Sequence, residues 1–147
     1  MTQVTEGGWT PPEAHSGPAL PREVSEWLGR GACATLATVE PDGTPQLSVV
    51  WAHCDGLHIL MATVAGRRKH QNLLRDPKCT VLVTPPEDQD HYVEIRGRVE
   101  IVEEGGRALI DQLHLKHRGT KPYPWDGPDD VRHVLKLHPE RVITFRG

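Results

Sequence analysis

The chain lacks the features that mark membrane, secreted and nucleic-acid-binding proteins. No apolar run approaches the roughly 20 residues that a membrane-spanning helix requires. Residues 1–6 have neither the basic nor the apolar region of a signal peptide. The net charge is −3 with histidine neutral, so no overall positive charge attracts nucleic acid or an anionic membrane. We therefore expect a cytoplasmic protein that binds neither nucleic acid nor membrane.

Cysteine is scarce and poorly spaced for cross-links or metal binding. The three cysteines are odd in number, lie far apart and form no CxxC pair, which argues against a disulfide framework or a zinc site. We expect Cys33, Cys54 and Cys79 to be small apolar side chains in or near strands. His114 and His117 lie three apart on a predicted helix, but no third ligand accompanies them. We predict that both are exposed and that the protein has no metal site.

The composition is that of a small domain preceded by an arm. Aromatic residues make up only 5% of the chain, but the 14 glycines raise the apolar share above its stated 37% to an ordinary globular level. Residues 1–20 are rich in Pro, Gly, Thr and Glu and predict a flexible arm. We expect one folded domain over residues 21–147. Because a domain of this size leaves much of its surface exposed, dimerisation would bury more of it.

Short alternating segments predict a mostly antiparallel sheet with short helices between its strands. Turn signals at residues 40–43 and at Asp55-Gly56 predict that the first three strands form a meander. A Rossmann fold is disfavoured, since no GxGxxG motif follows a strand and the connections are too short for parallel crossovers. Closure into a barrel would remove the sheet edges. The predicted strands are 32–39, 46–53, 57–63, 79–84, 91–102, 131–137 and 141–145, and the predicted helices are 21–28, 67–75 and 105–116.

The segment 91–102 shows the clearest alternation of apolar and charged side chains. Its charged face carries both signs, as expected of a sheet with one wet side. Gly97 falls on the apolar face, where it predicts a bend or the close approach of a neighbouring strand. Further along, Pro139 predicts a break between the last two strands.

The most informative segment runs from residue 63 to residue 73. A strand ends at Thr63, a turn follows at Gly66, and the cations Arg67, Arg68 and Lys69 open a helix. Free N–H groups at a helix N-terminus attract an anion, whereas cations there oppose the helix dipole. Such basic runs are usually solvated patches. Here the glycine turn and the placement of the charges favour a phosphate site.

Several short motifs occur in a specific order and spacing. They are residues 43–51, Asp55-Gly56, residues 63–73, Arg75-Asp76-Pro77, residues 92–97, Tyr123-Pro124-Trp125 and residues 139–142. Together they resemble the flavin- and deazaflavin-dependent split-barrel oxidoreductases, the pyridoxamine 5′-phosphate oxidase-like, coenzyme F420-dependent class. The resemblance covers about residues 22–145. It implies an FMN-binding split β-barrel fold, mostly β with short helices, that forms a homodimer.

The resemblance also assigns residues to the phosphate end of a cofactor site. Arg67 and Lys69 would bind the cofactor phosphate, with Arg68 and Asn72 nearby. Thr63 would donate its hydroxyl to the phosphate or to the ribityl chain. Gln71 departs from the family pattern, which often has arginine there, so this chain has one cation fewer for an anionic group.

The other end of the site would hold the ring. Main-chain hydrogen bonds to the isoalloxazine or deazaflavin edge would come from Ser48, Val49, Val50 and Trp51. Tyr123 and Trp125 would come from the partner chain and wall a pocket between protomers. From the residues alone, Trp51 suits the core equally well, and Tyr123 and Trp125 suit anchoring of their loop on its own barrel. The family often has proline at the position of Val49 and an aromatic residue at that of Ala52.

The function implied is an oxidoreductase that transfers hydride between coenzyme F420 and a small unsaturated or carbonyl-type organic substrate. No dedicated acid or base is evident among the motifs, and such chemistry needs none from the protein. One alternative is an FMN-dependent oxidoreductase of the same fold. Others are a non-catalytic flavin- or haem-binding protein and a structural dimer without a ligand.

Overall fold

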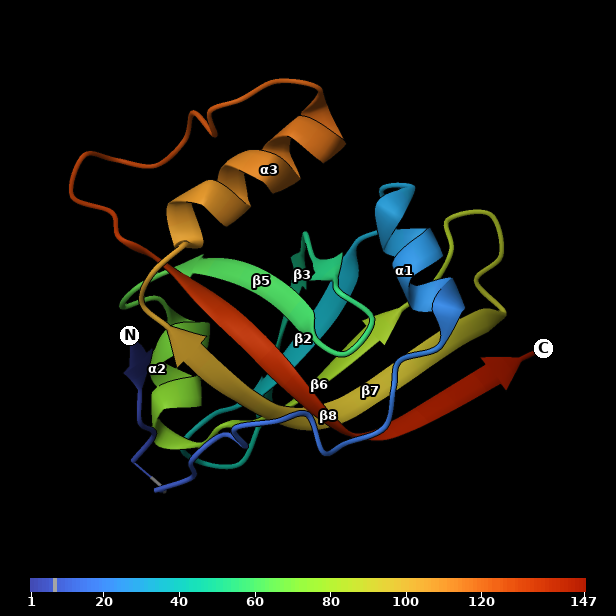
Figure 1. Cartoon of the computed structure of the whole chain (residues 1–147), viewed down its shortest axis with the longest axis horizontal. Coiled ribbons are helices and arrows are strands. Elements are labelled where there is room, and N and C mark those ends of the chain that lie inside the picture. The colour runs from blue at the N-terminus through green and yellow to red at the C-terminus, as the bar shows by residue number, and fades with distance from the viewer. Residues whose placement is uncertain (7) are drawn as a thin grey trace.

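Eight strands form one antiparallel sheet in the computed structural model, which describes residues 1–6 and 8–147 (Figure 1). The strands follow the order β3-β2-β6-β7-β8-β5-β4, and β1 pairs with β7 outside this path. No ladder among the described residues joins the two ends of the order, so the curved sheet forms a barrel that is open on one side. The predicted split barrel, mostly β with short helices, is confirmed. The strands are β1 (Thr2–Gln3), β2 (Ala34–Val39), β3 (Pro45–Val50), β4 (His53–Cys54), β5 (Ile59–Val64), β6 (Lys78–Val83), β7 (His91–Val102) and β8 (Arg132–Arg146).

The three predicted helices are confirmed, each within two residues of its predicted bounds. They are α1 (Arg22–Gly29), α2 (Arg68–Arg75) and α3 (Gly106–Arg118), and they lie around the sheet in Figure 1. α1 follows Pro21, whose restricted φ suits the entrance of a helix. It packs against β4 and β6 and buries its apolar side chains Val24, Trp27 and Leu28.

The predicted meander of the first three strands is confirmed at its two turns and wrong in its middle strand. β3 pairs with β2, whereas β5 pairs with β4 and β8 at the opposite end of the sheet. The predicted strand 46–53 is therefore broken: β3 ends at Val50, and β4 begins at His53. Between them Trp51 and Ala52 carry the chain across the open side of the barrel. Each turn signal joins two strands that do pair, β2 with β3 and β4 with β5. Local turn chemistry does not show that the chain passes from one end of the sheet to the other between these two hairpins.

The predicted break at Pro139 is also wrong. β8 runs without interruption from Arg132 to Arg146 and pairs with β7 along its length. The pairing register shifts at the Arg96/Gly97 step of β7, where Glu140 is an extra residue in β8. A bulge of this kind accommodates proline inside a strand, because the ladder is already interrupted there.

Gly97 makes the close approach expected of it. A Cβ atom at this position would lie 2.0 Å from the backbone oxygen of His138 in β8. The same site carries the register shift, so the absence of a side chain allows β8 to bend across β7.

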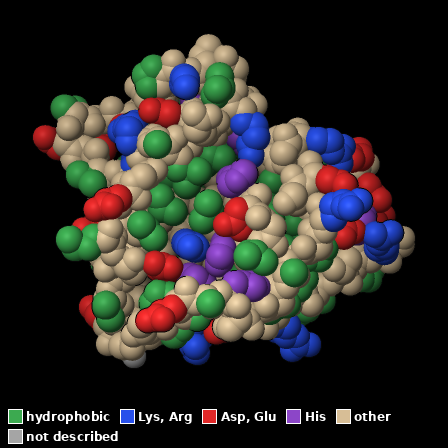
Figure 2. Space-filling view, in the orientation of Figure 1, with side chains coloured by type: hydrophobic (Ala, Val, Ile, Leu, Met, Phe, Trp, Pro, Cys, Tyr) green, Lys and Arg blue, Asp and Glu red, His purple; other side chains and the backbone are tan. Residues whose placement is uncertain are grey.

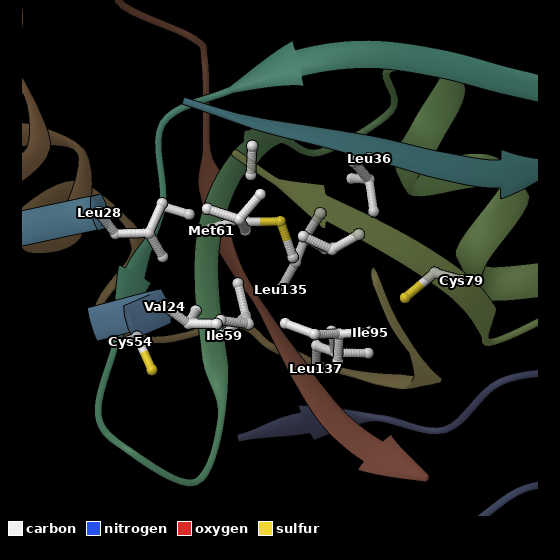
Figure 3. Close-up of a cluster of buried hydrophobic side chains, with 14 of the residues drawn as sticks. Val24, Leu28, Leu36, Cys54, Ile59, Met61, Cys79, Ile95, Leu135 and Leu137 are labelled. Atoms are coloured by element: carbon white, nitrogen blue, oxygen red, sulfur yellow. The ribbon is translucent and has the colours of Figure 1, made fainter. Parts of the chain in front are cut away.

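The inward-facing side chains of the strands and α1 form the core (Figure 3). Alternate residues are buried along β2 and β5, which follows from the period of two in a strand. Burying each large aliphatic side chain contributes about 1.5–3 kcal/mol. All three cysteines lie in or next to strands as predicted, and their thiols are free. Cys54 and Cys79 belong to this core, whereas Cys33 is exposed. The fully buried residues include Leu28, Leu36, Ile59, Met61, Ile95, Leu135 and Leu137.

The segment 1–20 has several contacts with the barrel. Thr2 and Gln3 form β1 and pair with the end of β7. Leu20 is buried and its N–H donates to the Gly56 carbonyl (3.1 Å). Trp9 packs edge-on against His138, with ring centroids 5.8 Å apart. The flexibility expected of this arm stays a prediction.

Charged side chains of both signs are interspersed on the face shown in Figure 2. Lysine and arginine side chains lie next to aspartate and glutamate side chains there, not in one large basic area. None of the helices in the described part of the chain has the length and apolar character needed to cross a bilayer.

Candidate functional site

A cavity of about 250 Å³ lies at the opening of the barrel. Residues of β3 and β5, two strands that do not pair with each other, line it together. Val49 and Trp125 in its lining are 73% and 63% exposed, so the cavity opens to solvent. Most of the predicted site residues are brought together here; the exceptions are Ser48, Arg68 and Asn72. The lining consists of Cys33, Val49, Val50, Trp51, Ala62, Thr63, Arg67, Lys69, Ile110, Tyr123, Trp125 and Arg132.

A tight turn after β5 brings the basic segment to this cavity. The Val64 carbonyl accepts the Arg67 N–H (3.2 Å), and Gly66 between them has a φ of 95°, a conformation that glycine adopts without strain. In α2 the Gln71 N–H donates to the Arg67 carbonyl (3.0 Å). The N–H groups of residues 68–70 precede this first helical bond and therefore have no acceptor within the helix. The start of α2 thus suits an anion.

The three cations of this segment have different surroundings. Arg68 lies outside the cavity and pairs with Glu40 after β2 (Nη1–Oε2 3.1 Å). Arg67 and Lys69 line the cavity, and neither forms an ion pair with a carboxylate of the described residues. Burial lowers the pKa of the Lys69 ammonium, and the charges of Arg67 and Arg132 lower it further. An anion bound beside Arg67 and Lys69 would offset this uncompensated positive charge.

A buried hydroxyl lies next to these cations. Thr63 at the end of β5 is 1% exposed, and its Oγ1 atom has no hydrogen-bond partner among the described residues. Because a buried hydroxyl without a partner costs free energy, an oxygen atom of a ligand in the cavity would stabilise the site. Asn72 has a structural role instead: its Nδ2 donates to Thr38 Oγ1 (3.0 Å), which fastens α2 to β2.

The end of β3 supplies the opposite wall. Val49, Val50 and Trp51 line the cavity, whereas Ser48 lies outside the lining and its Oγ is buried without a partner. β3 is an end strand that pairs with β2 on one side only. Its other side therefore presents backbone N–H and C=O groups at the opening of the barrel. These groups can bond the polar edge of a ring, as the sequence predicts.

Aromatic side chains form a third wall. Trp51 stacks on His117 of α3, with centroids 4.8 Å apart and planes at 6°. Tyr123 packs edge-on against Trp51 (6.3 Å) and against Trp125 (5.3 Å). Tyr123 and Trp125 line the cavity of their own chain, and a role for them in a partner's pocket stays a prediction. The predicted exposure of His114 and His117 is wrong. His117 is half-buried under Trp51, and His114 is 4% exposed beneath these rings and bonds a loop carbonyl.

Sequence reasoning missed the ion pair that holds this aromatic loop. Asp126 is 2% exposed at its side chain and accepts from Arg132 at both carboxylate oxygens (2.8 Å each) and from Arg107 (2.8 Å). Arg132 also donates to the Ala62 carbonyl (3.1 Å), and its guanidinium lies 4.9 Å from the centre of the Tyr123 ring. No motif signals this pair, because Asp126 lies in a loop rich in Gly and Pro.

The arrangement fits an elongated ligand with an anionic group at one end and a flat polar-edged group at the other. The cations and the Thr63 hydroxyl suit a phosphate, and the open edge of β3 with Trp51 suits a ring. The residues present are therefore compatible with a flavin or deazaflavin cofactor. None of the described side chains in the lining is placed as an obvious acid or base pair, so the chemistry would come from the ligand.

Solved structures with similar folds include proteins of related and of distant sequence. A protein described as an F420 reductase is 27% identical, with a TM-score of 0.73 over 84% of this chain and 98% of its own. A conserved hypothetical protein from Mycobacterium tuberculosis is 26% identical, with a TM-score of 0.68 over 90% of this chain and 89% of its own. General Stress Protein 26 from Bacillus anthracis, at 18% identity and a TM-score of 0.63, covers 84% of this chain and 91% of its own, and shows the fold alone.

No curated protein matches the chain in sequence. The family model described as pyridoxamine 5′-phosphate oxidase matches residues 20–146, which is nearly the whole length. This range includes every strand of the split barrel except β1 and every residue that lines the cavity. The chain therefore belongs to the pyridoxamine 5′-phosphate oxidase-like family of flavin and deazaflavin split-barrel proteins.

Proposed function

We propose that this protein is an oxidoreductase that transfers hydride between coenzyme F420 and a small unsaturated or carbonyl-type organic substrate. The observation that carries the proposal is the pair of cavity-lining cations Arg67 and Lys69, which lack carboxylate partners among the described residues and lie beside the orphaned Thr63 hydroxyl. An uncompensated cationic end of this kind favours a phosphorylated cofactor. The 27% identity to an F420 reductase supports a deazaflavin over a flavin.

The protein's own groups would bind and orient the cofactor. Arg67, Lys69 and Thr63 would hold its phosphate, and the free backbone edge of β3 near Val49 and Val50 would bond the polar edge of the ring. When bound, the deazaflavin ring supplies the hydride chemistry. Donors at that edge would stabilise negative charge that develops on the pyrimidine side.

The aromatic loop would enclose the substrate. Tyr123 and Trp125 stand across the cavity from β3 and are held by the Asp126–Arg132 pair. Such a wall orients a small conjugated substrate beside the ring and excludes water from the transfer. Water at the open mouth would then supply the proton, since no lining side chain is assigned to that task.

A homodimer is part of the proposal. Leu47, Val49 and Leu82 are 63%, 73% and 37% exposed on the outer face of β3 and β6, the two strands that flank β2, where Thr35 pairs with both Val49 and Leu82. An exposed apolar row of this kind favours burial against a second copy. Because Val49 also lines the cavity, the second copy would stand beside the cofactor site. We propose a cytoplasmic location, as the sequence predicts.

The test is a binding titration of F420 and FMN with the wild type and with Arg67→Ala/Lys69→Ala. We expect the double variant to bind the preferred cofactor at least about 100-fold more weakly, because two charge-assisted contacts are lost. Arg68→Ala is the matched control: its guanidinium pairs with Glu40 outside the cavity, so affinity should stay within about threefold.

A turnover assay distinguishes an enzyme from a non-catalytic protein that only binds the cofactor. Reduced F420 mixed with the protein and a panel of enones and carbonyl compounds should lose its reduced-state absorbance faster than without protein. Tight binding without turnover over the panel would favour a non-catalytic binding protein. Preference for FMN over F420 would favour the FMN-dependent alternative. Equal affinity of the wild type and the double variant for both cofactors would reject the site.

A further inference from the structure

Two side chains of α2 form hydrogen bonds with the backbone of Gly66. The Gly66 N–H donates to Nδ1 of His70 (3.1 Å), and Nε2 of Gln71 donates to the Gly66 carbonyl (2.8 Å). Both polar groups of the glycine are therefore bonded by consecutive residues of the helix that it precedes. Gly66 itself has a φ of 95° in the turn that leads into Arg67.

We propose that His70 is a positioning residue, whose Nδ1 atom fixes the Gly66 turn and thereby directs Arg67 and Lys69 into the cavity. Gln71 supports the same turn through its hydrogen bond to the Gly66 carbonyl. The inference rests on the proposed function, because positioning matters only if those cations bind a phosphate. His70 does not line the cavity and is 5% exposed, so it acts on the ligand only through the turn.

The surroundings of His70 hold its ring in one tautomer. Since Nδ1 accepts the Gly66 N–H, the neutral ring carries its proton on Nε2. That atom lies 3.2 Å from Nδ1 of His133 in β8 and 3.2 Å from Oε1 of Gln3 in β1. Both are able to accept the proton, so the ring is bonded at both nitrogens and cannot rotate without losing contacts.

The neutral form of His70 is also the favoured one. Burial lowers the pKa of His70, and the charge of His133 lowers it further. The cations Arg67 and Lys69 on the adjoining segment and Arg132 beside His133 place further positive charge in this region. A protonated ring would lose the acceptor for Gly66.

These hydrogen bonds also satisfy the Gly66 carbonyl, which would otherwise depend on solvent for a donor. The Gln71 amide covers it instead. This accounts for a neutral amide at the position where the sequence lacks an additional cation: Gln71 serves the turn, and the phosphate is left to Arg67 and Lys69.

The experiment compares ligands with and without a phosphate. FMN and riboflavin differ only in the phosphate, so the ratio of their dissociation constants reports the phosphate contacts alone. F420 and its phosphate-free chromophore differ in the phosphate and in the tail attached to it, so their ratio reports both together. We expect His70→Leu to lower the affinity for the phosphorylated ligand about tenfold and to leave the other unchanged. His70→Asn should restore most of the loss, because its side-chain oxygen can accept the Gly66 N–H.

A second variant keeps the test valid if His70→Leu fails to fold. Gln71 is exposed, so Gln71→Leu should fold normally and lower the affinity for the phosphorylated ligand about threefold. Gln112→Leu, the same change at an exposed position of α3, is the control and should leave both affinities unchanged.

The outcomes separate the two proposals. A wild type that binds the phosphorylated and phosphate-free ligands equally well would reject the phosphate site itself. A wild type that prefers the phosphorylated ligand, together with His70→Leu and Gln71→Leu variants that keep the full preference, would overturn the role of the turn alone. Equal losses for both ligands, or no rescue by His70→Asn, would also overturn it, since they indicate general damage.

Discussion

Individual polar atoms in the site differ in whether the protein itself bonds them. Thr63 and Thr38 are both 1% exposed threonines in strands. The Thr38 hydroxyl donates to Gln46 Oε1 (2.6 Å) and accepts from Asn72, whereas the Thr63 hydroxyl has no partner among the described residues. The Thr38 hydroxyl therefore stabilises the fold, whereas the Thr63 hydroxyl is free to bond a ligand.

Replacing Thr63 with valine should separate binding from stability. Thr63→Val removes an unpaired buried hydroxyl, so we expect thermal stability of the ligand-free protein to be unchanged or slightly raised. Cofactor affinity should fall about tenfold, because one hydrogen bond to the ligand is lost. Calorimetry without ligand and a cofactor titration check the two parts.

The matched variant Thr38→Val should behave in the opposite way. It leaves the Asn72 amide without its acceptor, so unfolding free energy should fall by about 1–3 kcal/mol while cofactor affinity changes little. If Thr63→Val destabilised the ligand-free protein as much as Thr38→Val does, the view of Thr63 as a ligand-binding group would be wrong.

At the scale of elements, two irregular features shape the barrel. One is the register shift between β7 and β8, where Gly97 meets the backbone of His138. The other is the loop between α3 and β8, which is folded over the cavity by Asp126. Gly97 on the apolar face of residues 91–102 predicted the close approach at the first feature. No regular pattern predicted the second, because it depends on contacts made by an irregular loop.

Gly97→Ala should destabilise the fold strongly. The new Cβ would lie 2.0 Å from the His138 backbone oxygen, and neither strand can move without breaking the ladder. We expect a loss of about 3 kcal/mol or more, measured by denaturant unfolding. Gly29→Ala at the end of α1 has open space around it and should be neutral or stabilising by up to about 1 kcal/mol. A Gly97→Ala protein as stable as the wild type would contradict the close approach.

Asp126→Asn should loosen the aromatic loop in a pH-dependent way. Hydrogen bonds from Arg132 and the charges of Arg132 and Arg107 hold the pKa of this carboxyl below its ordinary value of 3.8. Because the pKa of Asp126 is lower in the folded state, the ionised carboxylate stabilises the fold at pH values above the ordinary pKa. This stabilisation is lost as the pH falls through the folded-state pKa. We expect the free energy of unfolding of the wild type to exceed that of Asp126→Asn by about 2–3 kcal/mol at neutral pH.

That difference should shrink as pH falls below about 4, because the carboxylate becomes protonated. Melting temperatures measured across the acid range give the profile. Asp129→Asn, an exposed change in the same loop, serves as control and should show no such profile. A difference between wild type and Asp126→Asn that stayed constant through the acid range would mean that the ion pair is not its source.

At the scale of the whole molecule, apolar side chains remain exposed on one outer face of the sheet. Leu47 and Leu82 lie there on β3 and β6, with Ala37 and Thr35 of β2 between these strands. The cavity at the open side of the barrel adjoins this face through Val49. Association through this face and cofactor binding are therefore expected to be coupled.

Leu47→Asp/Leu82→Asp should convert the dimer into a monomer. Neither residue lines the cavity, and both are exposed in the single chain, so folding should persist. Light scattering after size exclusion should give twice 16.4 kDa for the wild type and 16.4 kDa for the variant. Leu57→Asp, at an apolar residue 40% exposed in the β4–β5 turn, should leave the dimer intact. A monomeric wild type at micromolar concentration would contradict this use of the face.

The sequence by itself determined the elements and the chemical character of the site. Alternation along residues 91–102, the glycine turn at Gly66 and the cations after it depend on neighbours in the chain, and all were predicted. Tertiary structure alone decided which strands pair beyond the hairpins, that Arg68 turns to Glu40 while Lys69 faces the cavity, and that Asp126 meets Arg132. The physical reason is range: local propensity acts over a few residues, whereas pairing, burial and charge compensation depend on groups that only folding brings within contact distance.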